Sequence, residues 1–192
     1  EQSGGRPVAG LILFHGAGGD RNHRLFLALE EALDVPVARV NFPYREKGPG
    51  RRPPDRMPKL IEAVNRAVET WSTAWDAPVD RLVVGGRSMG GRAASMAVAE
   101  GLDPAGLALL SYPLHPTGKP EKLRVDHFGA VGCPTLLVQG TRDPMGRPDE
   151  FAVHLPAIAG SLTEHWIDGN HSPSEKFDVE IIDVVKGWLA GL

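Results

Sequence analysis

The sequence predicts an α/β fold with about six mainly parallel strands and helices on both faces of the sheet. Two observations predict it. Most of six short apolar runs are nearly continuous in Val, Leu and Ile, as strands that are buried on both faces are. Segments with apolar residues at spacings of three and four lie between these runs, and such alternation is typical of βαβ units. A chain of 192 residues suits one domain, so we expect a single domain over residues 1–192.

The expected elements follow one another along the chain. The expected strands are Val8–Phe14, Val37–Phe42, Leu82–Gly85, Leu107–Ser111, Leu136–Gln139 and Glu164–Ile167. Apolar spacing predicts helices over Leu25–Leu33, Leu60–Trp75 and Phe177–Trp188, and an alanine-rich segment spans Ala93–Ala99. Two irregular stretches, Arg45–Arg56 and Leu114–Pro134, follow strands. In open α/β sheets the ligand crevice lies outside the carboxyl ends of the strands, so both stretches should border a site.

The composition excludes several classes of protein. A formal net charge of −3 gives no field that would attract nucleic acid or an anionic membrane. The longest apolar stretch, Val8–Phe14, is far shorter than the roughly 20 residues of a membrane-spanning helix. One cysteine excludes an intrachain disulfide framework and a multi-cysteine zinc site, and no histidine pair has the helical spacing of metal ligands. We therefore expect no metal, nucleic-acid or membrane partner, and the oligomeric state stays open.

Cysteine usage also bears on the compartment. A single cysteine fits a reducing environment, and no basic, apolar and small-residue signal opens the chain at Glu1. We expect a cytoplasmic protein.

The strongest functional motif is Gly-x-Ser-x-Gly, which runs from Gly86 to Gly90. A sharp strand-to-helix turn holds its serine in a strained backbone conformation, and side chains two residues to either side would collide. Glycine removes that clash, so the Ser88 Oγ stands clear above the sheet beside a helix N-terminus. We predict that Ser88 is a nucleophile. The alternative is a glycine-rich turn that only packs a helix tightly on a strand.

A second glycine-rich segment, His15–Gly19, follows the first strand. Attack by Ser88 on a carbonyl creates an oxyanion, which needs two N–H donors already in place. We predict that the donors are Met89, which follows the nucleophile, and Ala17 in this loop. The loop could instead cradle phosphate, although its spacing matches neither Gly-x-Gly-x-x-Gly nor a P-loop lysine motif. His15 is expected to hold the loop rather than to act as a base.

A serine nucleophile needs a base to take its proton. Of the seven histidines, His171 lies between the last expected strand and the last expected helix, and we predict that it is the base. His115 and His127 lie in a loop and are alternatives. His154 and His165 are expected to be structural or surface groups.

The base in turn needs an acid to orient it. Asp143 lies just beyond the fifth expected strand, and we predict that it is this acid. Asp168 is the alternative. It lies only three residues before His171, which is a short stretch of chain for its carboxylate to reach the far side of the imidazole ring.

Positive charge gathers in the Arg45–Arg56 stretch. Such a run is typical of solvated surface. Because it follows a strand, it could also overhang the crevice and bind an anionic group through Arg51 and Arg52. Arg87, beside the nucleophile, is a third candidate for substrate binding.

The chain order Ser88, Asp143, His171 is that of the α/β-hydrolase fold. Together with six segments given below, this order makes the sequence resemble small serine hydrolases of the dienelactone-hydrolase-like group. Within that group it resembles relatives of the third subunit of the NSL acetyltransferase complex and its testis-expressed relative. These segments are His15–Gly19, Phe42–Tyr44, Arg51–Pro53, Gly85–Gly91, Gly140–Asp143 and Asn170–Ser172. Dienelactone hydrolases use a cysteine nucleophile, whereas the only cysteine here, Cys133, precedes a strand, so their specificity is not expected.

The functional hypothesis is a serine hydrolase that cleaves an ester-like acyl bond of a small molecule through an acyl-enzyme, without a cofactor. The alternative is a non-catalytic interaction module that keeps the fold. In many enzymes of this fold an apolar helical cap is inserted where Leu114–Pro134 lies. This stretch is polar and rich in Pro and Gly. We therefore expect no cap, and a shallow site that prefers short acyl groups.

Overall fold

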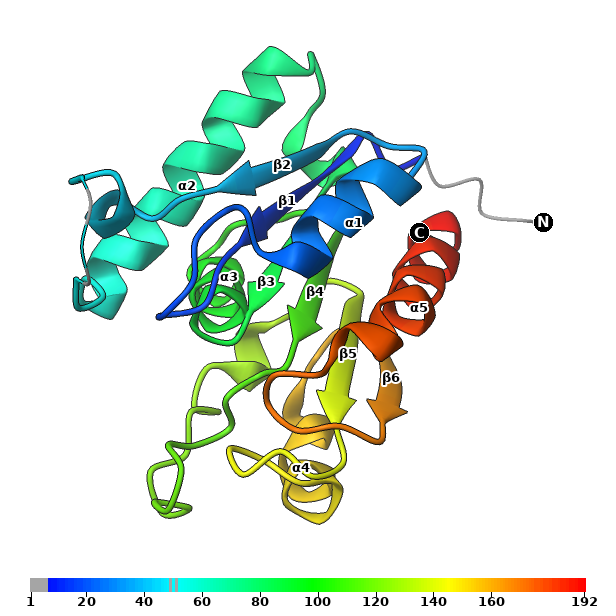
Figure 1. The fold of residues 1–192 in the computed structure, drawn as a ribbon. Coiled ribbons are helices and arrows are strands. Elements are labelled where there is room, and N and C mark those ends of the chain that lie inside the picture. Colours follow the sequence, from blue (N-terminus) through cyan, green and yellow to red (C-terminus); the bar gives the residue numbers. More distant parts are fainter. Residues whose placement is uncertain (1–6, 49, 51) are drawn as a thin grey trace.

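Six parallel strands form one sheet in the computed structural model, which describes residues 7–48, 50 and 52–192 (Figure 1). The sheet order is β2-β1-β3-β4-β5-β6. The predicted α/β fold with a parallel sheet is confirmed. The strands are β1 (Gly10–Phe14), β2 (Val37–Val40), β3 (Leu82–Arg87), β4 (Gly106–Leu110), β5 (Thr135–Gly140) and β6 (Leu162–Ile167).

Helices cover both faces of the sheet (Figure 1). Leu11 and Leu13 of β1 pack with α1 (Arg24–Ala32) and α5 (Asp178–Ala190). Ile12 and Phe14 point to the opposite face, where they pack with α2 (Met57–Ala74), α3 (Met89–Ala99) and α4 (Pro148–His154). All four side chains are fully buried, which explains why the run is apolar at every position. The single-turn 3₁₀ helices are η1 (Pro43–Arg45), η2 (Val79–Arg81), η3 (Phe128–Ala130), η4 (Leu155–Ala157) and η5 (Glu175–Phe177).

The strand ends differ from the sequence-based expectation. β2 stops at Val40 instead of Phe42, because the Phe42 N–H donates to the His15 side chain and not to a strand. β3 continues to Arg87, which pairs with Leu110 of β4. Apolar periodicity also does not predict α4, because its seven residues bury only Phe151.

The strand order places a crevice between β1 and β3. The chain runs from β1 to β2 on one side of it, and then returns past β1 to β3 on the other side. The carboxyl ends of β1 and β3 are neighbours, with Phe14 opposite Gly86. Ligands of open α/β sheets bind at such a switch point. The Gly-x-Ser-x-Gly motif begins within the last two residues of β3, and the His15–Gly19 loop follows β1, so both lie at this end of the sheet.

A cap is absent from the part of the chain that the structure describes. Between β4 and β5, where a cap would be inserted, the backbone forms only the 3₁₀ turn η3. Within the described ranges, every helix is too short or too polar to cross a membrane.

Helix α3 approaches β1 so closely that no side chain fits between them. A Cβ atom on Gly90 would overlap the Phe14 carbonyl oxygen, and one on Gly86 would overlap the same oxygen from β3. By contrast, a Cβ on Gly187 of α5 meets no atom within 4 Å. The glycines of the motif are therefore required by backbone contact and not by turn conformation alone.

We expect Gly90→Ala to lower the free energy of unfolding by about 1–3 kcal/mol or more, because the added methyl forces α3 away from β1. The matched helical variant Gly187→Ala should raise it by about 0.5–1 kcal/mol, since alanine is the better helix former in open space. Urea unfolding of both variants measures the difference. Equal effects of the two substitutions would contradict the close approach.

Candidate active site

Ser88 lies at the turn between β3 and α3 with φ 53° and ψ −118°. A positive φ is uncommon for a non-glycine residue and marks a strained backbone. The strain lifts the side chain out of the line of the strand, and the Ser88 residue lines an open cavity at the crevice. The predicted geometry of a nucleophile elbow is present here.

Ser88, His171 and Asp143 form one hydrogen-bonded chain. His171 Nδ1 lies 2.7 Å from Asp143 Oδ2, and His171 Nε2 lies 2.8 Å from Ser88 Oγ. A carboxylate oxygen can only accept, so Nδ1 carries the proton and Nε2 accepts from the serine hydroxyl. The structure thus brings together in one hydrogen-bonded chain the three side chains that the sequence singles out.

The Asp143 carboxylate is completely buried and fully supplied with donors. Oδ1 accepts from the Met145 N–H at 2.8 Å, and Oδ2 accepts from Gln139 Nε2 at 2.7 Å as well as from His171. Sequence analysis missed Gln139. A buried carboxylate is costly unless it is hydrogen-bonded, so Gln139 has a clear physical purpose. The signal that could have found it is an amide side chain within the otherwise apolar β5.

The alternative acid and bases lie elsewhere. Asp168 is largely exposed and pairs with Arg142 at 3.0 Å. His115 Nε2 contacts Glu150 at 2.9 Å, and His127 Nε2 contacts Ser95 Oγ at 2.7 Å. None of these three groups takes part in the hydrogen-bonded chain at Ser88.

The loop after β1 is held by two side chains. His15 Nε2 accepts from the Phe42 N–H at 3.1 Å, so its Nδ1–H donates to the Gly16 carbonyl at 2.8 Å. The buried Tyr44 hydroxyl donates to the Ala17 carbonyl at 2.9 Å. His15 therefore has the structural role expected from the sequence. With the Ala17 carbonyl turned toward Tyr44, the peptide unit is fixed beside the crevice.

Met89 is the first residue of α3, and Met89 and Ala17 line the same cavity as Ser88. The first N–H groups of a helix have no partner within the helix and carry partial positive charge. The two predicted oxyanion donors thus belong to residues on the wall of the cavity that contains Ser88.

Arg87 contacts the loop that carries the candidate base. One of its terminal nitrogens donates to the His171 carbonyl at 2.9 Å and to Ser172 Oγ in the same loop at 2.6 Å. Burial, followed by the positive charge of Arg24, lowers the pKa of Arg87. These contacts fix the position of His171, and a role of Arg87 in substrate binding stays a prediction.

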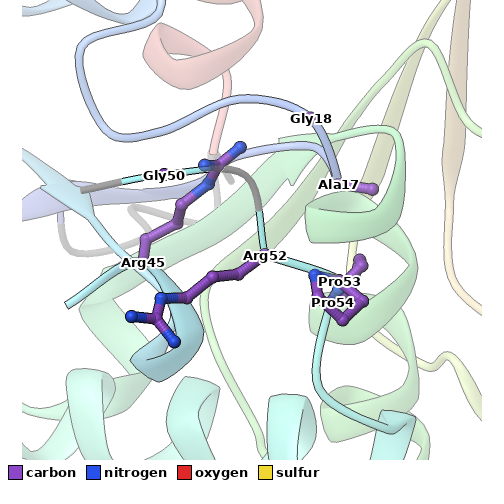
Figure 2. Close-up of a pocket in the computed structure, with 7 residues that line it drawn as sticks. All are labelled: Ala17, Gly18, Arg45, Gly50, Arg52, Pro53 and Pro54. Atoms are coloured by element: carbon purple, nitrogen blue, oxygen red, sulfur yellow. The ribbon is translucent and has the colours of Figure 1, made fainter. Parts of the chain in front are cut away.

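Of the two predicted anion-binding residues, Arg51 and Arg52, the structure describes Arg52. Arg51 lies outside the described residues. Arg52 lines a cavity of about 860 Å³ together with Arg45 and the loop residues Ala17 and Gly18. Figure 2 shows its side chain extending away from Ala17, and its guanidinium donates to the Lys47 carbonyl at 2.9 Å. Substrate binding by Arg52 stays a prediction.

A second cavity, of about 340 Å³, contains Ser88 itself. Ala17 lines both cavities, so the two adjoin at the loop after β1. The volume is at the low end of the range of about 300–1,000 Å³ that is typical of ligand pockets.

Residues 7–180 match the family described as the alpha/beta hydrolase domain. The chain belongs to the alpha/beta hydrolase family. This match covers the sheet, the elbow at Ser88 and the loop that carries His171.

Three solved structures resemble this alpha/beta hydrolase in fold. A monoacylglycerol lipase from Paleococcus ferrophilus is 14% identical, with a TM-score of 0.74 and 96% of each chain covered. Est1E from Butyrivibrio proteoclasticus, solved with ferulic acid bound, is 16% identical, with a TM-score of 0.77, 98% of this chain covered and 90% of that chain. The RedJ thioesterase of the prodiginine pathway in Streptomyces coelicolor is 20% identical, with a TM-score of 0.69, 95% of this chain covered and 91% of that one. At these identities the likeness shows the fold alone.

Burial keeps several histidines of the alpha/beta hydrolase neutral. Burial lowers the pKa of His15. It lowers the pKa of His23 and of His127 to about 4, and the neighbouring positive charges of Arg87 and Arg92, respectively, act in the same direction. Protonation of His15 would also remove the acceptor of the Phe42 N–H.

We expect the free energy of unfolding to fall as the pH is lowered from about 6.5 to about 4. The unfolded chain binds protons at the ordinary histidine pKa of 6.5, whereas folded His127 binds one only near 4. Protons therefore favour the unfolded state in this window. Urea unfolding at several pH values measures the slope. The variant His127→Gln should show a shallower slope, and an unaltered slope would contradict a neutral, buried His127.

Proposed function

We propose that this alpha/beta hydrolase is a serine hydrolase that cleaves an ester-like acyl bond of a small-molecule substrate. The observation that carries the proposal is the hydrogen-bonded chain from Ser88 through His171 to Asp143 at the switch point of the sheet. Each link lies within hydrogen-bond reach, which is the geometric requirement for an activated serine.

The proposed reaction has two halves. Ser88 Oγ attacks the carbonyl carbon while His171 Nε2 takes the hydroxyl proton. The carbon–oxygen bond to the leaving group then breaks, and the alcohol departs with the proton that His171 returns. In the second half, water attacks the acyl-enzyme, His171 takes a proton from the water, and Ser88 leaves as a hydroxyl when that proton is returned. Asp143 stabilises the imidazolium that forms in each half.

The negative charge on the tetrahedral intermediate needs fixed donors. We assign this role to the N–H groups of Met89 and Ala17, as the sequence predicts. The position of Met89 at the start of α3 and the bond from His15 to the Gly16 carbonyl, which belongs to the same peptide unit as the Ala17 N–H, support the assignment. Donors that are already in place do not have to reorganise during the reaction.

The similar solved structures support an acyl substrate, since two of them are named as a monoacylglycerol lipase and a thioesterase, and Est1E was solved with ferulic acid bound. Within the family, the proposal includes the sequence resemblance to the dienelactone-hydrolase-like group and to relatives of the NSL complex subunit. Cys133 is buried and burial raises its pKa to about 11, which is unsuited to a thiolate nucleophile. A cytoplasmic location remains part of the proposal, on the composition of the chain.

We expect a fluorophosphonate probe to label the native protein and not the Ser88→Ala variant. In an ester assay, His171→Gln should lower kcat by at least about 10³-fold, and the native rate should fall toward acidic pH because an imidazolium cannot accept the serine proton. Mass spectrometry of the labelled peptide and a pH–rate profile are the measurements. If the folded native protein resists the probe and hydrolyses no ester of a broad panel, a non-catalytic interaction module becomes the better hypothesis.

We expect short acyl chains to be preferred. The cavity at Ser88 is small, and the segment between β4 and β5 provides no apolar roof. Each methylene left in water forgoes about 0.8 kcal/mol of binding energy. In a series of nitrophenyl esters, kcat/KM should be highest at roughly two to four acyl carbons. A steady rise to ten or more carbons would disprove this expectation.

A further inference from the structure

Two arginines line the cavity that contains Ser88. Arg92 lies four residues after the nucleophile, on α3, and Arg124 lies on the segment between β4 and β5. Residues four apart on a helix lie on the same side, so Arg92 projects from the face of α3 that begins at the elbow. Arg124 approaches from a part of the chain that is distant in sequence.

Neither guanidinium is neutralised by a side chain in the described part of the chain. Among the described residues, neither forms an ion pair with a carboxylate. The Nε atom of Arg92 is buried and has no hydrogen-bond partner in the described chain. A buried donor without a partner costs free energy, which a bound acceptor would recover. Burial, followed by the charge of Arg92, lowers the pKa of Arg124, which agrees with two positive charges held close together.

Asp55 is the one carboxylate among the described residues that line this cavity. Its Oδ1 accepts from Lys59 Nζ at 3.0 Å, so this ion pair has no net charge, while its Oδ2 is buried without a hydrogen-bond partner among the described residues. The two arginines therefore leave a net positive charge on the cavity wall. The N-terminus of α3, which carries partial positive charge, adds to it.

The backbones that carry the two arginines are fixed. The Tyr112 hydroxyl, which is fully buried, donates to the Arg124 carbonyl at 2.6 Å. The Ser95 hydroxyl donates to the Arg92 carbonyl at 2.9 Å, and His127 Nε2 donates to that hydroxyl at 2.7 Å. A positive site whose backbone is ordered before the ligand arrives pays less entropy on binding.

The remaining wall of the cavity is mostly apolar. It is formed by Met57, Leu60, Met89, Pro113 and Met145. A ligand that fits therefore has a short hydrocarbon part beside these side chains and an anionic end at the arginines.

We propose that this cavity selects esters that carry a carboxylate a few methylenes from the scissile carbonyl, with the carboxylate bound by Arg92 and Arg124. The inference rests on the proposed serine hydrolysis and names its substrate class. Guanidinium groups match the planar carboxylate, to which they donate paired hydrogen bonds. The anionic group thereby lies in the nucleophile's own cavity, and not in the cavity that Arg52 lines.

The test compares two esters of the same length that differ only in one terminal group. Ethyl hydrogen succinate carries a carboxylate, and ethyl succinamate carries a neutral amide in its place. We expect the native enzyme to favour the succinate in kcat/KM, measured by ethanol release. Arg92→Gln and Arg124→Gln should each lower the succinate-to-succinamate ratio about 10-fold or more, because each removes a charge-assisted interaction. Arg92→Lys should keep part of the preference, since it keeps the charge. The control Arg66→Gln, on the exposed face of α2, should leave the ratio unchanged.

A ratio that neither Arg92→Gln nor Arg124→Gln lowers would overturn the inference, and so would a loss seen only in Arg52→Gln. Absence of turnover on both esters would count against the proposed function instead. Calorimetry then tests the subsite by itself, with ethyl hydrogen succinate and the folded Ser88→Ala protein. Binding that Arg92→Gln abolishes in this background supports the anion subsite, and absence of binding refutes it.

Discussion

The contact between the backbone of Gly90 and the carbonyl of Phe14 sets the distance between the elbow and the end of β1. This close approach puts the start of α3 beside the loop after β1. Met89 and Ala17 can then line one cavity with Ser88. A wider spacing would separate the two N–H groups that an oxyanion requires. The chemistry proposed for the site therefore depends on a packing distance that only glycine permits.

The loop after β1 is held by its own imidazole, His15, and by the chain beyond β2, which supplies Phe42 and Tyr44. Tyr44 holds the Ala17 carbonyl, and His15 bridges the Gly16 carbonyl to the Phe42 N–H. His15 and Phe42 also meet edge to face, with ring centroids 5.1 Å apart. The neutral state of His15 is part of this arrangement, because the bridge needs one nitrogen that donates and one that accepts.

The charged side chains on the two sides of Ser88 differ in whether they have partners within the described chain. On the side of the base, the Asp143 carboxylate is buried and accepts from Gln139, Met145 and His171. On the cavity side, Arg92 and Arg124 lack carboxylate partners among the described residues. Proteins rarely leave partly buried charge unbalanced without a ligand to balance it. The asymmetry separates a site that is complete within the protein from one that awaits an anion.

The sequence by itself determined the parallel sheet and the positions of Ser88, Asp143 and His171 along it, because buried strands and strained elbows leave local patterns of apolar residues and glycine. It did not reveal Gln139 or the pair formed by Arg92 and Arg124. Asp143 and its donor Gln139 are four residues apart, but their contact depends on how the chain turns after β5. Arg92 and Arg124 are 32 residues apart and share a cavity only because the segment after β4 folds back over α3. The hydrogen bond between Ser95 and His127, which are also 32 residues apart, joins the same two parts of the chain. A cluster of this kind has no local sequence pattern, because an arginine in a helix or loop usually faces solvent. Only the tertiary structure decided that these two arginines face the cavity.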